Sequence, residues 1–384
     1  DKHLVPTEEQ YALKRWLETT LKPLLEKHSG GVFHNFGSCE NGFWMEGSDV
    51  DACLVIPRCT KKPSWLTKLR LVQSLAEREK LGTAEVVRGA RVPVAKLVNA
   101  SGAELVDVSV NNVAALENSR FVGTLARLDP RVPGLGRFIK YWASQRRINK
   151  RSEGTLSTYT LILQLFFFLQ TRQPPVLPLV TSILVDPSLL SSGGASGDGS
   201  SGEVFKAVNA FISSPEMDEV SGELRPLPFL TERDAIQEAG RFPFAEENKE
   251  SIGELLLGFF QLWGHEEFRG NEGSGQTVYV YDGSREVNDL GVVVMRCPLT
   301  GKNVNPFTTT VWRAIHAEFE RAANLLQQGC SLEELCERAE ELPAGCGVRG
   351  GTTASALAAA LVPPPPPTAP EPAVAVVTPA VSVE

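Results

Sequence analysis

Two aspartates stand two positions apart in the segment GSDVD, just ahead of a run of apolar residues. Residues 52–57, ACLVIP, have the composition of a buried strand, so Asp49 and Asp51 lie at or just before its start. Side chains two positions apart on a strand point to the same side, which brings two negative charges to one place. The spacing therefore predicts a cation between them.

A third carboxylate, Asp107, lies in AELVDVSV, where apolar residues alternate as they do on a strand with one buried face. An isolated carboxylate in such a strand is costly unless it is paired or bound to a metal. Three carboxylates on two neighbouring strands can hold two hard divalent cations, which prefer oxygen ligands and readily bridge phosphates. We therefore predict Asp49, Asp51 and Asp107 as catalytic metal ligands, with Mg²⁺ as the natural ion and Mn²⁺ as a substitute.

Two glycine-serine turns, Gly37-Ser38 and Gly47-Ser48, accompany the first two aspartates. Such turns offer backbone N–H groups and a hydroxyl at close approach to phosphate oxygens. Taken alone, each glycine-serine turn is typical of an ordinary loop, and Asp-x-Asp alone is typical of a turn or of the solvated start of a strand. The conjunction of both turns, the apolar strand and the distant third aspartate favours a phosphate and metal site.

The elements that must position these residues follow from apolar periodicity. Residues 7–28 carry leucines at helical spacing behind a threonine cap, which predicts a helix. The front of the chain then reads as mixed strands and helices, and the rest as mostly helical, which indicates an α+β protein. The other predicted elements are strands at 50–56, within 84–98 and at 103–110, helices over 134–171, 251–264 and 308–328, and a strand pair at 277–281 and 291–295 around the turn DGSREVND.

Composition bounds the class of protein. The chain has 384 residues, 42% apolar and 22% charged, which suffices for a sizeable core and two or three units. The net charge is −8, yet residues 1–172 carry 25 Lys and Arg against 17 Asp and Glu, and residues 173–384 carry 13 against 29. The basic front half holds the aspartates, which suits a polyanionic ligand there.

Seven scattered cysteines, with no CxxC pair and no nearby histidine, argue against a zinc site or a disulfide framework. The apolar run at 161–170 is too short to span a bilayer, so no membrane association is expected. Residues 173–250, which include a glycine and serine tract, read as an insertion with a small domain between 204 and 240. Residues 343–384 are rich in proline and alanine and are predicted to be disordered.

At this point the sequence resembles the polymerase-β-like nucleotidyltransferases, in particular terminal uridylyltransferases and noncanonical poly(A) polymerases. Further blocks are similar to that family in its order: RVPVAKL, VDVSVNN, ALENSRFV, LGRFIKYWASQRRIN, GTLSTYTLILQLFFFL and SIGELLLGFFQLW. The resemblance covers roughly residues 30–170 and 251–325. The compact layout, with an insertion in the second domain, is most similar to the trypanosome mitochondrial uridylyltransferases of RNA editing.

The resemblance implies a mixed-sheet catalytic domain at 30–125 and a mostly helical base-binding domain made of 1–29 and 126–342. It implies a cleft between them, the insertion at 173–250 and the tail at 343–384. It further implies template-independent transfer of UMP from UTP to an RNA 3′-hydroxyl by a two-metal mechanism, with release of pyrophosphate. A mitochondrial location and a larger RNA-processing complex follow from the same resemblance.

The family pattern also assigns roles to residues outside the aspartate triad. Ser38, Ser48 and Lys140 would contact the triphosphate, while Asn118 and Ser119 would hold the ribose hydroxyls and the base edge. Tyr159 would stack on the base, with Thr158 beside it. RNA phosphates would meet Arg88, Arg91, Lys96 and Arg120, with little reading of sequence.

The sequence departs from the family at two places. Ser144, itself a predicted nucleotide contact, occupies the position of a second phosphate-binding lysine. Either phosphate affinity is lower here, or Arg146 or Arg147 substitutes for that lysine. Cys297 replaces an aspartate in the segment that helps to select the base, which leaves an RNA adenylyltransferase using ATP as an alternative. An inactive RNA-binding scaffold is the alternative from another class, and the intact triad argues against it.

Overall fold

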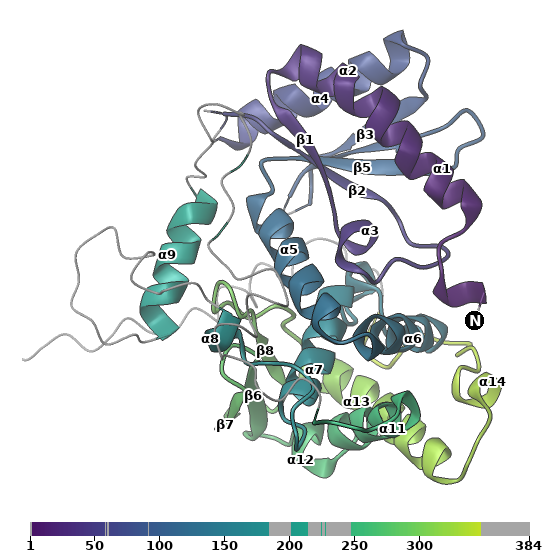
Figure 1. The fold of residues 1–384 in the computed structure, drawn as a ribbon, viewed down its shortest axis with the longest axis vertical. Helices are drawn as coiled ribbons and strands as arrows, with labels where there is room; N and C mark the ends of the chain where they lie inside the picture. Colours follow the sequence, from purple (N-terminus) through teal and green to yellow (C-terminus); the bar gives the residue numbers. More distant parts are fainter. Residues whose placement is uncertain are drawn as a thin grey trace, which may run out of the picture. The chain divides into compact units, whose positions relative to one another are not determined.

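A five-stranded mixed sheet forms one part of the molecule (Figure 1). Two of the predicted carboxylates, Asp51 and Asp107, lie on its strands, and Asp49 precedes the first of these strands. The computed structural model describes residues 2–57, 59, 61–90, 92–183, 201–213, 224, 227 and 247–346. The strand order is β1-β2-β5-β4-β3, in which β2 and β5 are parallel and the other neighbours antiparallel. The strands span Val32–Phe36 (β1), Asp51–Val55 (β2), Thr83–Val87 (β3), Val94–Val98 (β4) and Glu104–Val110 (β5). The β2–β5 register pairs Asp51 with Asp107, so the sheet joins the two predicted aspartate strands.

Three helices cover this sheet (Figure 1): α1 (Glu8–Trp16), α2 (Lys22–Ser29) and α4 (Lys62–Arg78). Thr7 and Gln10 form a reciprocal capping box at the start of α1, which satisfies two otherwise unpaired N–H groups. A π-helical turn over Leu17–Leu21 connects α1 to α2, so the helix predicted over 7–28 is confirmed.

The leucine stripe of this N-terminal helix is buried in the apolar core of the sheet. Leu17, Leu21 and Leu25 belong to the same cluster as Leu54 of β2. This placement differs from the expected grouping of 1–29 with the second domain. The physical reason is that an amphipathic helix buries its apolar stripe on the nearest unpaired sheet face, a choice that its sequence alone leaves open.

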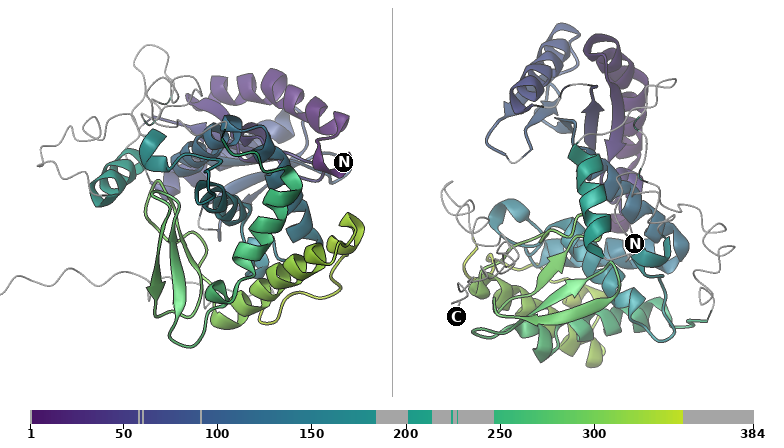
Figure 2. Two further views of the ribbon diagram at one scale, coloured as in Figure 1. Left: turned by 60° about the horizontal axis from the view of Figure 1, so that its bottom comes forward. Right: turned by 90° about the vertical axis from the view of Figure 1, so that its left-hand side faces the viewer.

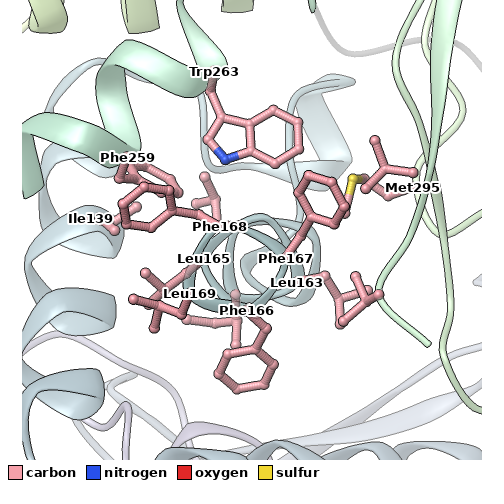
Figure 3. Close-up of a cluster of buried hydrophobic side chains, with 14 of the residues drawn as sticks. Ile139, Leu163, Leu165, Phe166, Phe167, Phe168, Leu169, Phe259, Trp263 and Met295 are labelled. Carbon is pink, nitrogen blue, oxygen red and sulfur yellow. The ribbon is translucent and has the colours of Figure 1, made fainter. Parts of the chain in front are cut away.

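A second core lies among helices α5 (Val113–Leu128), α6 (Arg131–Gln145), α7 (Thr158–Gln170), α11 (Ile252–Trp263) and α13 (Thr309–Gln327). Helix α7 is apolar on every side because neighbours surround it, with Phe259 and Trp263 of α11 on one side and Met295 on another (Figure 3). The helices predicted within 134–171 and at 251–264 and 308–328 are thereby confirmed.

A separate three-stranded sheet stands beside these helices (Figure 2). Its central strand β6 (Gly275–Tyr279) pairs antiparallel with β7 (Ser284–Asn288) and parallel with β8 (Val294–Arg296). The two predicted strands are present, but β7 was mistaken for part of the turn between them. Four of the five β7 residues are exposed, so this strand lacks the apolar alternation that would have revealed it.

The insertion contributes two described helices, α8 (Val180–Ile183) and α9 (Ser201–Ser213). Phe205 of α9 packs edge-on against Tyr281, with ring centroids 5.3 Å apart, and Asn209 Nδ2 donates to the carbonyl of Thr300 at 3.1 Å. Most of the small domain predicted at 204–240, and the tail after residue 346, lie outside the described residues. None of the helices in the described part of the chain combines the length and apolarity that a membrane span requires.

The remaining short helices connect the larger elements. They are η1 (Lys2–Leu4), α3 (Ser38–Asn41), η3 (Arg151–Glu153), α12 (Glu266–Arg269) and α14 (Leu332–Leu335).

Candidate active site

A cleft of about 500 Å³ brings together most of the predicted site residues. One wall comes from the two glycine-serine turns and the start of β2, and the other from helices α5, α6 and α7. The predicted residues that line it are Ser38, Ser48, Asp49, Asp51, Asn118, Ser119, Lys140, Ser144, Thr158 and Tyr159. Asp107 and the described RNA-binding candidates Arg88, Lys96 and Arg120 do not line it.

The first glycine-serine turn touches a carboxylate through its backbone. Gly37 has φ 76° and ψ −151°, and a Cβ added to it would lie 2.7 Å from Asp51 Oδ2. Ser119 holds this turn, because its Oγ accepts from Gly37 N at 2.8 Å and donates to Gly37 O at 3.2 Å. The Ser119 hydroxyl therefore binds the turn. The sequence analysis predicted a ribose contact for Ser119 and did not predict this contact with the turn.

Asp51 and Asp107 are neighbours across the β2–β5 pair, and both are partly buried. Burial, followed by the charges of Asp107 and Asp49, raises the pKa of Asp51 to about 6. Burial also raises the pKa of Asp107, against the opposing effect of Lys96. Desolvated carboxylates that repel one another are stabilised by a shared cation, so their oxygens suit a hard metal ion.

Lys96 forms a cross-strand ion pair with the third aspartate. Its Nζ lies 3.0 Å from Asp107 Oδ2 and 3.7 Å from Glu104 Oε1. Asp107 lines a neighbouring cavity of about 260 Å³ that shares Ser48 and Asp49 with the cleft. In the part of the chain that the structure describes, no three His, Cys, Asp or Glu side chains are arranged to hold a metal ion. A metal site at the triad therefore requires Asp107 to exchange Lys96 for the cation.

Lys140 of α6 reaches across the cleft to the second glycine-serine turn. Its Nζ donates to Ser48 Oγ at 2.6 Å, which joins the second core to the loop that carries Asp49. Burial lowers the pKa of Lys140 to about 8, while Asp49 and Asp51 oppose that shift. A buried ammonium beside a serine hydroxyl is suited to a polyanion, because phosphate oxygens can replace the hydroxyl as acceptors.

Replacing Lys140 by methionine is expected to lower kcat/KM for nucleotide transfer by about 10- to 100-fold, since a hydrogen bond to a charged group contributes roughly 1.5–3 kcal/mol. Steady-state kinetics on the purified variant would measure this. The matched control is Lys62→Met on the exposed start of α4, which should leave kcat/KM unchanged. Equal kinetics for Lys140→Met and the control would contradict the assignment of Lys140 to the triphosphate.

The two arginines proposed to replace a second lysine are placed away from the cleft lining. Arg146 pairs with Glu318 through Nε at 2.8 Å and Nη2 at 3.1 Å. Arg147 Nη1 donates to the carbonyl of Glu340 at 2.6 Å. Ser144 does line the cleft, so the position of the second lysine is filled by a neutral hydroxyl without substitution by either arginine.

The base end of the cleft is formed by the start of α7 and by α5. Tyr159 Oη donates to Asn118 Oδ1 at 3.0 Å, and both side chains line the cleft. Thr158 Oγ1 donates to Asn149 Oδ1 at 3.3 Å, and Asn149 also lines the cleft. Asn149 ends the family-like block LGRFIKYWASQRRIN, but it lies in the loop after α6 and was given no role from the sequence.

The described RNA-binding candidates Arg88, Lys96 and Arg120 are absent from the cleft lining. Arg88 is exposed just after β3, and Arg91 lies outside the described residues. Arg120 lines a separate cavity of about 300 Å³ and donates to the carbonyl of Leu227 at 3.0 Å. Lys96 is paired with Asp107. Their role toward RNA stays a prediction.

The chain is similar to known RNA nucleotidyltransferases. Residues 2–127 match the family model described as the central palm domain of mitochondrial-like poly(A) RNA polymerase. Poly(A) RNA polymerase cid11 of Schizosaccharomyces pombe is 27% identical over 318 residues, which are 80% of this chain and 56% of that protein. Human terminal uridylyltransferase 4 is 29% identical over 235 residues, 60% of this chain and 12% of that protein.

A crystal structure of the Cid1 poly(U) polymerase matches with a TM-score of 0.64 and 22% identity, over 87% of this chain and 94% of that one. This likeness confirms the predicted α+β nucleotidyltransferase fold. The chain spans little more than half the length of the first of these curated relatives and a much smaller share of the uridylyltransferase. The chain is thus similar to poly(A) RNA polymerases and terminal uridylyltransferases in sequence, with the palm-domain match confined to residues 2–127, and similar to the Cid1 poly(U) polymerase in fold.

Proposed function

We propose that this protein transfers UMP from UTP to the 3′-hydroxyl of RNA without a template and releases pyrophosphate. The observation that carries the proposal is that two kinds of group line one cleft. Carboxylates, two glycine-serine turns and Lys140, which donates to Ser48, line it together with Tyr159, which donates to Asn118. The first group suits a triphosphate and the second suits a nucleoside.

Within this proposal each side chain has a defined task. Tyr159 offers an aromatic ring to the base, and Lys140 with Ser48 neutralises and positions the leaving phosphates. The RNA O3′ attacks the α-phosphorus, the bond from that phosphorus to the bridging oxygen breaks, and pyrophosphate leaves. Asp107 would accept the proton of the attacking hydroxyl as the general base.

Asp49, Asp51 and Asp107 would hold Mg²⁺, in two ions, with Mn²⁺ able to replace it. The bound ion would lower the pKa of the attacking hydroxyl and neutralise charge on the phosphates. The support is the donor chemistry of the carboxylates, of which Asp51 and Asp107 are partly buried. Structures of the related Cid1 polymerase are described as bound to MgATP and MgGTP, which favours a divalent ion here as well.

An RNA adenylyltransferase is the second candidate, because the relatives include both poly(A) RNA polymerases and terminal uridylyltransferases. Purified protein with Mg²⁺, an RNA bearing a free 3′-hydroxyl and each of the four nucleotides in turn separates the two. We expect UTP to give the highest kcat/KM. Preferential incorporation of AMP would establish the alternative, and no incorporation of any nucleotide would establish an inactive RNA-binding scaffold.

Variants at the base end test the assignment of the pocket. Because stacking contributes about 1–3 kcal/mol and depends little on the base, Tyr159→Ala should raise KM for UTP and ATP alike. Asn118→Ala should weaken UTP use through the ribose and base-edge contacts. If Tyr159→Ala inverted the nucleotide preference while Asn118→Ala changed neither nucleotide, the pocket would be assigned wrongly.

We further propose that the protein acts in mitochondria on RNA-processing or RNA-editing substrates, as part of a larger complex. The support is the resemblance to the trypanosome enzymes and the description of the matched palm family as mitochondrial-like. Fractionation of cells that express the tagged full-length protein would place it with or apart from mitochondrial markers.

A further inference from the structure

A buried thiol stands directly behind the base end of the cleft. Cys297 Sγ lies 3.4 Å from Tyr159 Oη and 3.8 Å from Asn118 Oδ1. Its side chain is 6% exposed and does not line the cleft, whereas Tyr159 and Asn118 do. The three polar groups therefore form a chain that runs from the protein interior to the nucleotide site.

The loop that carries Cys297 is fixed on both sides. Cys297 N donates to the carbonyl of Lys302 at 2.9 Å, and Gly301 N donates to the carbonyl of Cys297 at 2.8 Å, which closes a tight turn after β8. Asn305, 1% exposed, accepts from Ser157 N at 2.8 Å and binds this loop to the first turn of α7. Tyr159 sits in that same turn, so the thiol and the phenol are held at a set distance.

The protons on these three groups determine which of them donates each hydrogen bond. A neutral thiol has one proton and a phenol has one, while an amide oxygen can only accept. Burial holds the pKa of Tyr159 well above its usual value, so the phenol keeps its proton. Tyr159 Oη donates to Asn118 Oδ1, the thiol of Cys297 donates to the same oxygen at 3.8 Å, and the thiol also lies within hydrogen-bond distance of Tyr159 Oη. Because Oδ1 of Asn118 accepts these hydrogen bonds, the Nδ2 group of its amide is bonded neither to Tyr159 nor to Cys297.

We infer that Cys297 is a positioning residue which, through Tyr159, orients the amide of Asn118 so that its NH₂ group faces the cleft. The cleft then offers a donor to a carbonyl or hydroxyl oxygen of the bound nucleotide. This inference rests on the proposed nucleotidyl transfer and adds a determinant of nucleotide binding to it. A carboxylate at position 297 can only accept, so it reverses the direction of these hydrogen bonds. Tyr159 Oη then donates to the carboxylate and accepts from Asn118 Nδ2.

Three substitutions separate orientation of the amide from simple packing. Cys297→Ser keeps a donor of similar size, Cys297→Ala removes the donor, and Cys297→Asp supplies an acceptor. We expect KM and the dissociation constant for Mg-UTP to stay within about twofold for serine, to rise about fivefold for alanine and to rise about tenfold or more for aspartate, with kcat nearly unchanged. Cys330→Ser, at a cysteine outside the cleft lining, is the control and should change neither constant.

A double substitution identifies the route. In an Asn118→Ala background, Cys297→Asp should add no further loss of Mg-UTP binding, because the amide that it reorients is gone. An additive loss, or equal behaviour of the serine and aspartate variants, would overturn the inference. Binding of Mg-UTP is measured without RNA. If the dissociation constants of the Cys297 variants rank as expected but the unmodified protein transfers no nucleotide to RNA, only the proposed function is rejected. Absence of Mg-UTP binding by the unmodified protein would reject both.

Discussion

Asp51→Asn is expected to abolish nucleotide addition and, in the same molecule, to stabilise the metal-free protein. Loss of a metal-binding carboxylate removes several kcal/mol of transition-state stabilisation, so kcat/KM should fall by at least about a thousandfold. The folded protein, by contrast, loses a charge that Asp107 and Asp49 repel and that burial disfavours. Activity and stability should therefore move in opposite directions.

The stabilisation has a defined pH window. The pKa of Asp51 is about 6 in the folded protein against a usual 3.8, so folding favours the neutral carboxyl group. The penalty for ionising it is absent below the unfolded pKa, grows through the interval and is complete above about pH 6. Urea unfolding with a chelator present should show a gain of about 2–3 kcal/mol for Asp51→Asn at neutral pH and no gain near pH 4.

Asp289→Asn, on an exposed loop, is the control for both readouts and should change neither stability nor turnover. Retained nucleotide addition by Asp51→Asn in the presence of Mg²⁺ would reject the metal-ligand assignment. A loss of stability at neutral pH would show that Asp51 contributes favourable contacts that outweigh its repulsion.

Gly37→Ala is expected to have the second largest effect. The backbone at Gly37, with φ 76° and ψ −151°, lies in a region that only glycine adopts readily, and the new methyl group would lie 2.7 Å from Asp51 Oδ2. We expect a loss of about 3 kcal/mol of folding free energy and a fall of about a hundredfold or more in kcat/KM as the carboxylate is displaced.

The second glycine-serine turn supplies the matched control. Gly47 also has a positive φ, 71°, but an added Cβ meets no atom within 4 Å. Gly47→Ala should therefore cost only the left-handed backbone penalty, about 1 kcal/mol, and leave turnover largely intact. Thermal unfolding and steady-state kinetics on both variants make the comparison. Equal losses at the two glycines would show that backbone strain, and not contact with Asp51, explains the requirement at Gly37.

Local patterns predicted much of the catalytic sheet. The period-two alternation around Asp107 and the apolar run after Asp51 were enough to expect two strands that bring carboxylates together, and β2 and β5 do so. Helices α7, α11 and α13 were recognised because long apolar or amphipathic segments leave few alternatives. These predictions succeeded because each depends on the spacing of residues within a single element.

What the sequence did not reveal depends on contacts between distant segments. Lys96 meets Asp107 because β4 and β5 are neighbours, and strand order cannot be read from either strand alone. Arg146 is held by Glu318, 172 residues away in the chain. The buried thiol of Cys297 likewise reaches Tyr159 only after the loop behind β8 folds onto the start of α7. In the sequence, each of these groups could have been free to contact a ligand. In the structure, each contacts another side chain of the protein.

The contact between α9 and the loop after β8 means that mutations in the insertion can affect this loop. Phe205 packs so closely that a Cβ on Gly301 would lie 2.7 Å from its ring, and Asn209 is bonded to Thr300. The loop that these residues support also carries Cys297, while the sheet with Asp51 and Asp107 is built separately. Mutations that reshape the insertion are therefore expected to disturb the proposed base-binding residues before they disturb the carboxylates.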